Sequence, residues 1–229
     1  MERSFASDNY AGVHPDVLAA MTAVNVGHQV SYGDDDTTAD LRGLIKDHFG
    51  PGAEVFPVFN GTGANVVAMQ AMAKPWEAVI CTQSAHVNVD EGGAPEVVAG
   101  LKLWQVPTPD GKLTPDLIDT QAWGFGDVHR AQPGVVAVTQ STELGTLYTV
   151  AELAAVVERA KRDGLRVLLD GARIMNAAAA LGVPFREFTT DLGIDAVSFG
   201  GTKNGAMGAE AVVTLTPELA EAVPYLRKT

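Results

Sequence analysis

Lys203 stands at a position where a lysine is costly. It follows a short apolar run, Ala196–Phe199, and two glycines, with no other basic residue near it in the sequence. Burial disfavours the charged form of an amine and lowers its pKa, and a neutral amine is the form that attacks a carbonyl carbon to give a Schiff base. Taken alone, the segment is more simply a glycine-rich turn with a solvated lysine at its tip. Asp170 and Arg173 shift the balance toward the chemical interpretation.

Asp170 lies at the carboxyl end of the apolar run Val167–Asp170. In open α/β sheets, ligands bind outside the carboxyl ends of the strands. The aspartate is therefore a candidate to bind a metal, to cap a helix or to pair with a cationic group of a ligand. Arg173 follows three residues later, so an ion pair within one helical turn is the simpler alternative. Gly171 and Ala172 weaken that alternative, because small residues let a ligand approach the backbone closely.

A glycine-rich turn, Asn60–Asn65, joins an apolar run to a helical pattern. Backbone amides at the N-terminus of a helix form an anion site, and Gly61, Thr62 and Gly63 are its candidate donors. The turn lacks the lysine of a phosphate loop and the third glycine of a dinucleotide fingerprint, so neither motif is met. An ordinary strand-to-helix turn is the alternative.

His86 follows the next apolar run, where a histidine can stack on a flat ring, exchange a proton or bind a metal. In principle, His86, Asp90 and Glu91 could hold a cation. The set has no second histidine or cysteine, so a transition-metal site is the less favoured interpretation and no metal is predicted. His129 lies in a loop-like segment, where a histidine taken alone is more often a surface residue than a catalytic one.

The composition restricts the class of protein. The chain has 229 residues, 46% of them hydrophobic and 19% charged, which is ample for one well-buried core. Its formal net charge of −12 argues against nucleic acid and anionic membrane surfaces as partners. Cys81 is the single cysteine, which excludes an intrachain disulfide and suits a reducing cytosol. The chain has no apolar stretch of membrane-spanning length and residues 1–7 lack the apolar core of a signal peptide, so we expect a cytoplasmic protein.

Apolar runs of strand length recur along the chain, with helical patterns between most of them. The runs are too continuous for a half-exposed sheet, so both faces should be covered, and the alternation predicts an α/β fold with a mostly parallel sheet. The connection after Phe199 is short and lacks a helical pattern, which predicts that the last run lies antiparallel to the one before it. The runs are Val55–Phe59, Ala78–Thr82, Leu103–Val106, Val135–Thr139, Val167–Asp170, Ala196–Phe199 and Ala211–Leu215.

Three of the helical patterns have recognisable features. Thr38–Phe49 carries apolar residues at helical spacing. Val150–Arg162 does so too, and it has an acidic residue early and basic residues late, as the helix dipole prefers. Thr114 precedes a proline, a combination typical of a capped helix start.

Together, these segments resemble the threonine aldolases of the β-eliminating lyase group, in order and over nearly the whole chain. Those proteins are pyridoxal 5′-phosphate (PLP) enzymes with the aspartate-aminotransferase fold, fold type I. Each piece alone is unspecific, whereas the ordered set is highly specific. The matching segments are Ser7–Asn9, Tyr32–Asp35, Asn60–Asn65, His86–Gly93, Asp127–His129, Gln140–Thr146, Leu169–Arg173 and Ser198–Gly205.

The resemblance implies a role for each candidate residue. Lys203 forms a Schiff base with PLP, and Asp170 pairs with the pyridinium nitrogen so that the ring can accept electrons. His86 stacks on the ring. The resemblance further implies that the phosphate is held by Gly61, Thr62 and Gly63. It implies that Arg173, with Ser7, holds the substrate carboxylate or the phenolic oxygen of the cofactor. It also implies that His86 and His129 contact the β-hydroxyl group of the substrate, directly or through water.

The implied reaction is a retro-aldol cleavage of the Cα–Cβ bond. It converts L-threonine, L-allo-threonine and related β-hydroxy-α-amino acids to glycine and an aldehyde. The base that accepts the hydroxyl proton is left open among His86, His129 and a held water. The nearest alternative is another PLP reaction on the same scaffold, β-elimination or serine hydroxymethyl transfer. An inactive fragment with a role in assembly is an alternative of a different class.

The resemblance also implies a large domain of three layers with a seven-stranded, mostly parallel sheet. We expect it to span residues 1–215, with the N-terminal segment 1–50 included. Residues 216–229 open a further helix and are expected to be the start of a missing or truncated small C-terminal domain. The family assembles as dimers of dimers with shared sites, so we expect a homo-oligomer, dimer or tetramer, that acts on a small amino acid.

Overall fold

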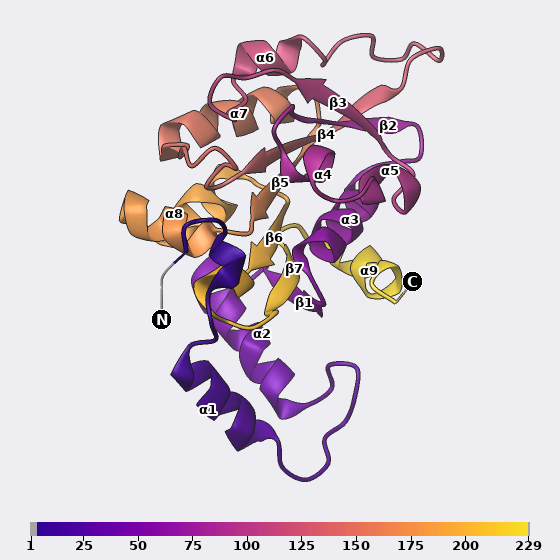
Figure 1. Cartoon of the computed structure of the whole chain (residues 1–229). Coiled ribbons are helices and arrows are strands. Elements are labelled where there is room, and N and C mark those ends of the chain that lie inside the picture. The colour runs from indigo at the N-terminus through magenta and orange to yellow at the C-terminus, as the bar shows by residue number, and fades with distance from the viewer. Residues whose placement is uncertain (1–3, 229) are drawn as a thin grey trace.

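The computed structural model describes residues 4–228, which form an α/β fold around one sheet (Figure 1). Within these residues the sheet has seven strands in the spatial order β1-β7-β6-β5-β4-β2-β3. Each predicted apolar run coincides with one strand to within a few residues, so the predicted fold class is confirmed. The strands are β1 (Glu54–Val58), β2 (Glu77–Thr82), β3 (Lys102–Val106), β4 (Gln132–Thr139), β5 (Arg166–Gly171), β6 (Ala196–Gly200) and β7 (Glu210–Thr214).

Within the described sheet, β7 alone runs antiparallel to the other strands. It pairs in this way with β1 and β6, whereas β2 with β3, β2 with β4, β4 with β5 and β5 with β6 are parallel pairs. Residues 201–209 join β6 to β7. So short a connection cannot carry the chain back to the end of the sheet at which β6 begins, as a parallel β7 would require. The predicted direction of the last strand is confirmed.

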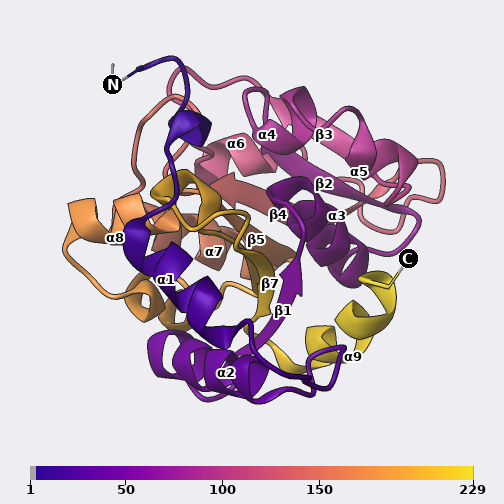
Figure 2. The same cartoon turned by 60° about the horizontal axis from the view of Figure 1, so that its bottom comes forward.

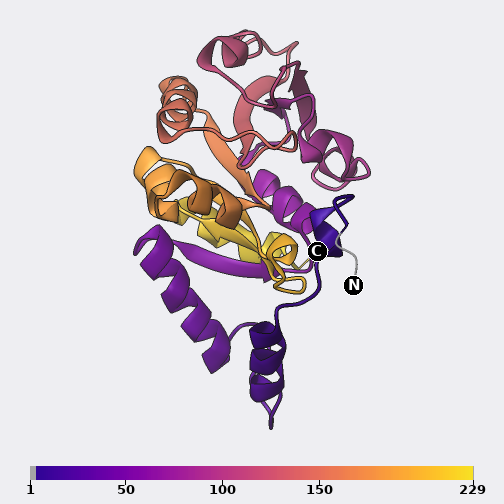
Figure 3. The ribbon, with the colours of Figure 1, turned by 60° about the vertical axis from the view of Figure 1, so that its left-hand side comes forward.

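Helices cover both faces of the sheet, which confirms the predicted three layers (Figure 3). Each face has its own buried apolar cluster. None of the helices within residues 4–228 is long and apolar enough to cross a membrane. On one face lie α2 (Asp36–Phe49), α6 (Pro115–Asp119), α7 (Val150–Arg162) and α8 (Ile174–Leu181). On the other lie α3 (Gly61–Met72), α4 (His86–Val89), α5 (Ala94–Val97) and α9 (Pro217–Leu226).

The local sequence sets where these helices begin. Thr149 and Glu152 form a capping box at the start of α7, in which Glu152 N donates to Thr149 Oγ1 at 3.2 Å and Thr149 N donates to Glu152 Oε2 at 2.7 Å. Asp35 caps α2 by accepting a hydrogen bond from Thr38 N at 2.8 Å. Thr114 caps α6 in the same way, as predicted.

The helix α9 packs against the sheet domain. Its Leu219 and Val223 are buried in the cluster that α3 also lines, and α9 contacts β1 and β7 as well. The predicted start of a helix at this point is confirmed. The described part of the segment 216–229 therefore covers the large domain, and the proposed division at residue 215 stays a prediction.

The N-terminal segment lies outside the three layers (Figure 2). It forms the short 3-10 helix η1 (Asp8–Tyr10) and the helix α1 (Pro15–Val24), neither of which contains a buried residue. A hydrogen bond from His14 N to Gly205 O, at 2.9 Å, ties it to the turn after η4 (Thr202–Asn204). The helix η1 itself contacts η4, so it lies beside the carboxyl end of β6, where Lys203 lies.

Candidate active site

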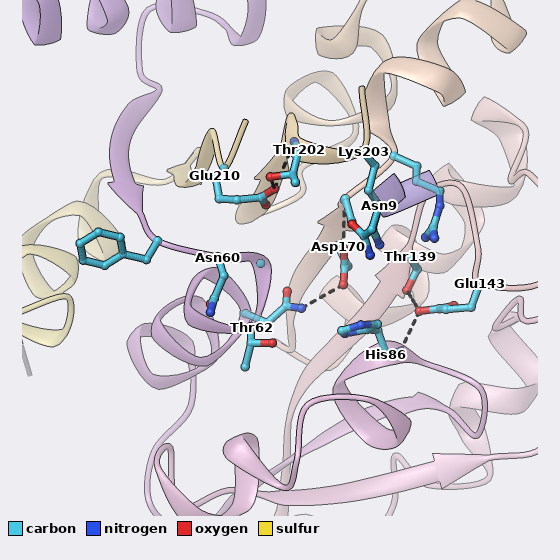
Figure 4. Close-up of a pocket in the computed structure, with 16 residues that line it drawn as sticks. Asn9, Asn60, Thr62, His86, Thr139, Glu143, Asp170, Thr202, Lys203 and Glu210 are labelled. Atoms are coloured by element: carbon cyan, nitrogen blue, oxygen red, sulfur yellow. Dashed lines mark hydrogen bonds between the residues drawn. The ribbon is translucent and has the colours of Figure 1, made fainter. Parts of the chain in front are cut away.

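A pocket of about 260 Å³ lies where the carboxyl ends of β4 and β5 and the turn η4 face the N-terminus of α3 (Figure 4). Ligands of open α/β sheets bind at this edge. Most of the predicted site residues line the pocket, whereas Ser7, Gly63 and His129 do not. The predicted residues in the lining are Gly61, Thr62, His86, Asp170, Arg173 and Lys203.

Asp170 is held in one orientation at the end of β5. The residue is only 6% exposed. Its Oδ1 accepts a hydrogen bond from Ala172 N at 3.0 Å, and its Oδ2 accepts one from Asn65 Nδ2 at 2.9 Å. Both donors are neutral, so they stabilise the carboxylate without cancelling its charge. A cationic group of a ligand in the pocket would therefore be a favourable partner for Asp170.

Lys203 lies in η4, directly after β6, and is half-buried. Within residues 4–228 its Nζ makes no hydrogen bond and no salt bridge. Its charge contributes to the electrostatics of both Asp8 and His86. An amine without partners on the wall of a pocket is available to attack a carbonyl carbon.

Arg173 pairs with Asp8. Its Nε donates to Asp8 Oδ2 at 2.6 Å, and its Nη2 donates to Asp8 Oδ1 at 3.2 Å. Burial alone would raise the pKa of Asp8, but the hydrogen bond and charge of Arg173, together with Lys203, lower that pKa. An ion pair between Arg173 and Asp170, the simpler alternative drawn from the sequence, does not form. Arg173 instead lines the pocket, and its ion pair with Asp8 holds η1 at the rim of the pocket.

The N-terminus of α3 offers backbone amides to the pocket. Asn60 caps the helix, because its Oδ1 accepts a hydrogen bond from Gly63 N at 2.7 Å. The cap therefore takes up the amide of one of the three residues predicted to hold a phosphate. The amides of Gly61 and Thr62 have no partner within the helix and remain for an anion.

An acidic side chain borders this anion site. Glu210 Oε1 accepts hydrogen bonds from Thr202 Oγ1 at 2.5 Å and from Thr202 N at 3.3 Å. A Cβ atom placed on Gly61 would lie 3.5 Å from Glu210 Oε2. The absence of a side chain at Gly61 therefore leaves the space between Glu210 and the start of α3 open.

His86 opens α4, and one side of its ring is fixed. Its Nδ1 lies 2.9 Å from Glu91 Oε1, and its backbone N donates to Glu143 Oε1 at 2.8 Å. The hydrogen bond to Glu91 raises the pKa of His86, against the opposing effects of burial and of Lys203. Because Nδ1 is occupied, Nε2 is the ring nitrogen left for a ligand.

Asn65, Glu143 and Glu210 are polar residues of the pocket that the sequence analysis did not assign to the site. Asn65 and Glu143 lie within segments that carry the family resemblance, which is the signal that could have found them. Asn65 Oδ1 and Glu143 Oε2 are buried and have no hydrogen-bond partner among the described residues. An unpartnered buried acceptor costs about 1–3 kcal/mol, so both oxygens are suited to donors from a ligand or from water.

Ser7 and His129 lie outside the pocket. Ser7 Oγ accepts a hydrogen bond from Asn9 N at 3.2 Å and so caps η1, and it is Asn9 that lines the pocket. His129 is exposed on the loop between α6 and β4, next to the amino end of β4, and its N donates to Asp127 Oδ1 at 2.9 Å. The substrate contacts predicted for Ser7 and His129 stay predictions.

The loop that carries His129 is held in place by contacts of two of its side chains, Arg130 and Gln132. The Arg130 guanidinium lies 4.0 Å from the ring centre of Trp104 and 3.7 Å from that of Trp123. Gln132 Nε2 and Oε1 bond to four backbone groups of the same loop. No group of three or more histidine, cysteine, aspartate or glutamate side chains in residues 4–228 is arranged to hold a metal ion.

Several known proteins are similar to this chain in sequence. Residues 4–229 match the family described as beta-eliminating lyase. The low specificity L-threonine aldolase of Pseudomonas aeruginosa is 44% identical over 224 residues, which are 97% of this chain and 65% of that protein. The low specificity L-threonine aldolase of Escherichia coli K12 is 30% identical over 174 residues, which are 76% of this chain and 51% of that protein.

Solved structures share the fold. The threonine aldolase of Leishmania major superposes with a TM-score of 0.93 at 33% identity, covering 99% of this chain and 66% of that one. A putative L-allo-threonine aldolase from Listeria monocytogenes has the same fold, with a TM-score of 0.75 at 20% identity. The chain thus spans 65% of the length of its P. aeruginosa relative. The match over residues 4–229 confirms the resemblance seen in the motifs and shows that the chain belongs to the β-eliminating lyase family.

Proposed function

We propose that the protein is a PLP-dependent aldolase that cleaves L-threonine, L-allo-threonine and related β-hydroxy-α-amino acids to glycine and an aldehyde. The observation that carries the proposal is the amine of Lys203, which has no partner in the described chain and shares a pocket with the carboxylate of Asp170. The names of the P. aeruginosa and L. major relatives support this class of substrate.

The groups of the pocket fit PLP in number and kind. Lys203 suits its aldehyde, and Asp170 suits a protonated ring nitrogen. The amides of Gly61 and Thr62 suit a phosphate, because a helix N-terminus attracts anions. The half-buried ring of His86 suits the face of a flat ring, and the unpartnered buried acceptors of the pocket suit the donors of a polar ligand.

When bound, PLP supplies an electron sink that takes up the electron pair of the broken Cα–Cβ bond. The carboxylate of Asp170 would pair with the ring nitrogen, and an opposite charge nearby would favour the protonated form of that nitrogen. Lys203 would hold the cofactor through its amine, and the same amine, when free, could carry a proton. Arg173 offers positive charge to the substrate carboxylate while it remains paired with Asp8.

Cleavage also needs a group that accepts the proton of the β-hydroxyl group. Within one chain we infer that His86 Nε2, or a water held beside it, has this role, because His129 lies outside the pocket. The raised pKa of His86, caused first by its hydrogen bond to Glu91, favours the protonated ring and therefore favours the held water. Glu143 Oε2, buried and unpartnered, is a second acceptor that supports such a water.

Product analysis tests the proposed function. The protein is incubated with PLP and L-threonine or L-allo-threonine, and the products are quantified. Equal amounts of glycine and acetaldehyde are expected. Ammonia and a keto acid would instead indicate β-elimination, and no turnover would favour a role in assembly. In a parallel incubation with serine and a one-carbon acceptor, transfer of the one-carbon unit would indicate hydroxymethyl transfer.

His86→Phe should separate stacking from hydroxyl chemistry. Phenylalanine retains a flat ring but has no nitrogen to hold a water or a proton, so PLP affinity should change little while kcat falls on the order of 10- to 100-fold. Spectroscopic titration with PLP and steady-state kinetics give the two values. His28→Phe is the matched control, because His28 is an exposed histidine. Full activity of His86→Phe would remove His86 from the hydroxyl chemistry.

We further propose that the protein acts as a homo-oligomer, a dimer or a tetramer, in the cytoplasm. Exposed apolar side chains on α1, namely Leu18, Met21 and Val24, support an interface with a second copy of the chain. The single, buried Cys81 is compatible with a reducing compartment. Light scattering on the purified protein measures the assembly directly, and a monomer at all concentrations would refute it.

A further inference from the structure

A line of hydrogen bonds joins His86 to Asp170 through Glu91 and Asn65. His86 Nδ1 lies 2.9 Å from Glu91 Oε1, and Asn65 Nδ2 donates to Glu91 Oε1 at 2.7 Å and to Asp170 Oδ2 at 2.9 Å. The side chain of Glu91 is 0% exposed, and Asn65 is 1% exposed. His86 and Asp170, at the two ends of the line, both line the pocket (Figure 4), whereas Glu91 does not.

Three distant segments supply this line. Asn65 lies on α3, Asp170 lies next to the last residue of β5, and Glu91 lies in the link between α4 and α5. Gly92 and Gly93 follow Glu91 with φ angles of 60° and 73°, in the left-handed region that favours glycine. The single helical turn of α4 places Glu91 close to His86, five residues earlier in the chain, and the two glycines then redirect the chain into α5.

The arrangement is unfavourable unless cations complete it. One amide nitrogen holds two carboxylates, and like charges so close together destabilise each other. Glu91 Oε2 and Asn65 Oδ1 are also buried without a partner. A cation at each end relieves the repulsion. The ring of His86, whose pKa the hydrogen bond to Glu91 raises, supplies one when it is protonated, and on the proposed function a protonated ring nitrogen of the cofactor would supply the other.

We propose that Glu91 and Asn65 are positioning residues, which fix the ring of His86 and the carboxylate of Asp170 as one unit. The inference rests on the proposed function. Glu91 binds the proton on His86 Nδ1, which leaves Nε2 for the pocket, and Asn65 holds the two carboxylates at a set separation. The surface on which a flat cofactor stacks and the partner of its ring nitrogen are thereby arranged before it binds.

Among the charged groups around His86, Glu91 has the largest effect on the pKa of the ring. The hydrogen bond to Glu91 is the largest influence on the pKa of His86, burial opposes it, and the charges of Asp170 and Lys203 act in opposite directions. Glu143 bonds to the backbone of His86 and not to its ring. Replacing Glu91 should therefore change the titration of this histidine more than any other single substitution around it.

Glu91→Gln tests this contact, because it keeps the shape of the side chain and removes its charge. The full chain is labelled with ¹³C-histidine and the ring signals are titrated by NMR, with and without PLP. The signal of His86 is identified by its loss in His86→Phe. We expect its midpoint to fall by about one pH unit or more in Glu91→Gln. Turnover with PLP should fall on the order of 10-fold at nearly constant KM.

Glu96→Gln is the matched control, since Glu96 is exposed on the neighbouring helix α5. It should leave both values as in the wild type. An unchanged His86 midpoint in Glu91→Gln would contradict the proposal, and so would a lowered midpoint with wild-type turnover. The wild type gives a readout that needs no variant. In its neutral ring, ¹⁵N shifts should place the proton on Nδ1, and a proton on Nε2 would overturn the assignment.

Asn65→Ala tests the other half of the line. Without the shared donor, Asp170 loses one of its two hydrogen bonds, so we expect the dissociation constant of PLP to rise on the order of 10-fold. Gln70→Ala, which removes an amide from the same helix with one exposed hydrogen bond, is the matched control. PLP affinity equal to that of Gln70→Ala, in a variant with wild-type thermal stability, would refute the role of Asn65.

The failure of this proposal is distinguishable from failure of the proposed function. The histidine titration requires neither cofactor nor substrate, so it reports on Glu91 whatever the protein catalyses. A wild-type protein that binds PLP but releases no glycine from threonine would refute the aldolase proposal. A normal His86 midpoint in Glu91→Gln, with glycine released, would refute only the positioning role.

Discussion

Lys203→Ala is expected to abolish turnover, with kcat/KM lower by about 1000-fold or more. The variant lacks the amine that would hold the cofactor, and Lys203 is the only lysine that lines the pocket among residues 4–228. Added PLP should then bind without the visible band of a C=N bond to the protein. Absorption spectra and glycine release, measured on the same preparation, test both expectations.

Lys102→Ala is the matched control for this variant. Lys102 is exposed on β3, away from the pocket, and makes no hydrogen bond or salt bridge within the described residues. Its removal should change neither the spectrum nor the rate. A visible band of normal intensity in Lys203→Ala would show that another amine holds the cofactor, and the site assignment would then be wrong.

Asp170→Asn is expected to lower turnover far more than cofactor binding. The amide keeps the shape of the carboxylate and removes its charge, so the ring nitrogen would no longer be held in its protonated form. We expect kcat to fall on the order of 100-fold or more, and PLP affinity to fall by less than about 10-fold. Steady-state kinetics and a PLP titration give the two numbers.

Asp90→Asn is the control for the loss of one carboxylate. Asp90 is exposed close to the site, between His86 and Glu91 in the sequence. It should behave as the wild type. A near-normal rate in Asp170→Asn would show that the pairing with the ring nitrogen is misplaced. Equal losses of turnover and of binding would show that Asp170 acts mainly in holding the cofactor.

Most of the fold could be predicted because its signals are local. Continuous apolar runs such as Val135–Thr139 are typical of strands covered on both faces. The length of the link after Phe199 was sufficient to predict the direction of β7. The order of strands across the sheet was not predicted. It depends on which edges pair, and β2, for example, lies between β3 and β4 through contacts made by residues far apart in the sequence.

The site was partly predictable for a related reason. Asp170 lies at the carboxyl end of its strand and Lys203 just beyond the end of another, and the carboxyl ends of parallel strands gather at one edge of a sheet. The partners of these residues could not be predicted, because they come from other segments. Arg173 bonds to Asp8, 165 residues away, instead of its near neighbour Asp170. Asn65 reaches Asp170 across 105 residues, whereas the glycine-rich turn that contains Asn65 predicts only an anion site.

The most direct test of the proposed active site is reduction of the wild-type protein with borohydride in the presence of PLP, followed by peptide mapping. We expect a yellow band that borohydride bleaches, with the reduced cofactor attached to the peptide that contains Lys203. A protein that shows no such band with excess PLP, or that carries the label on a different lysine, would contradict the proposed site.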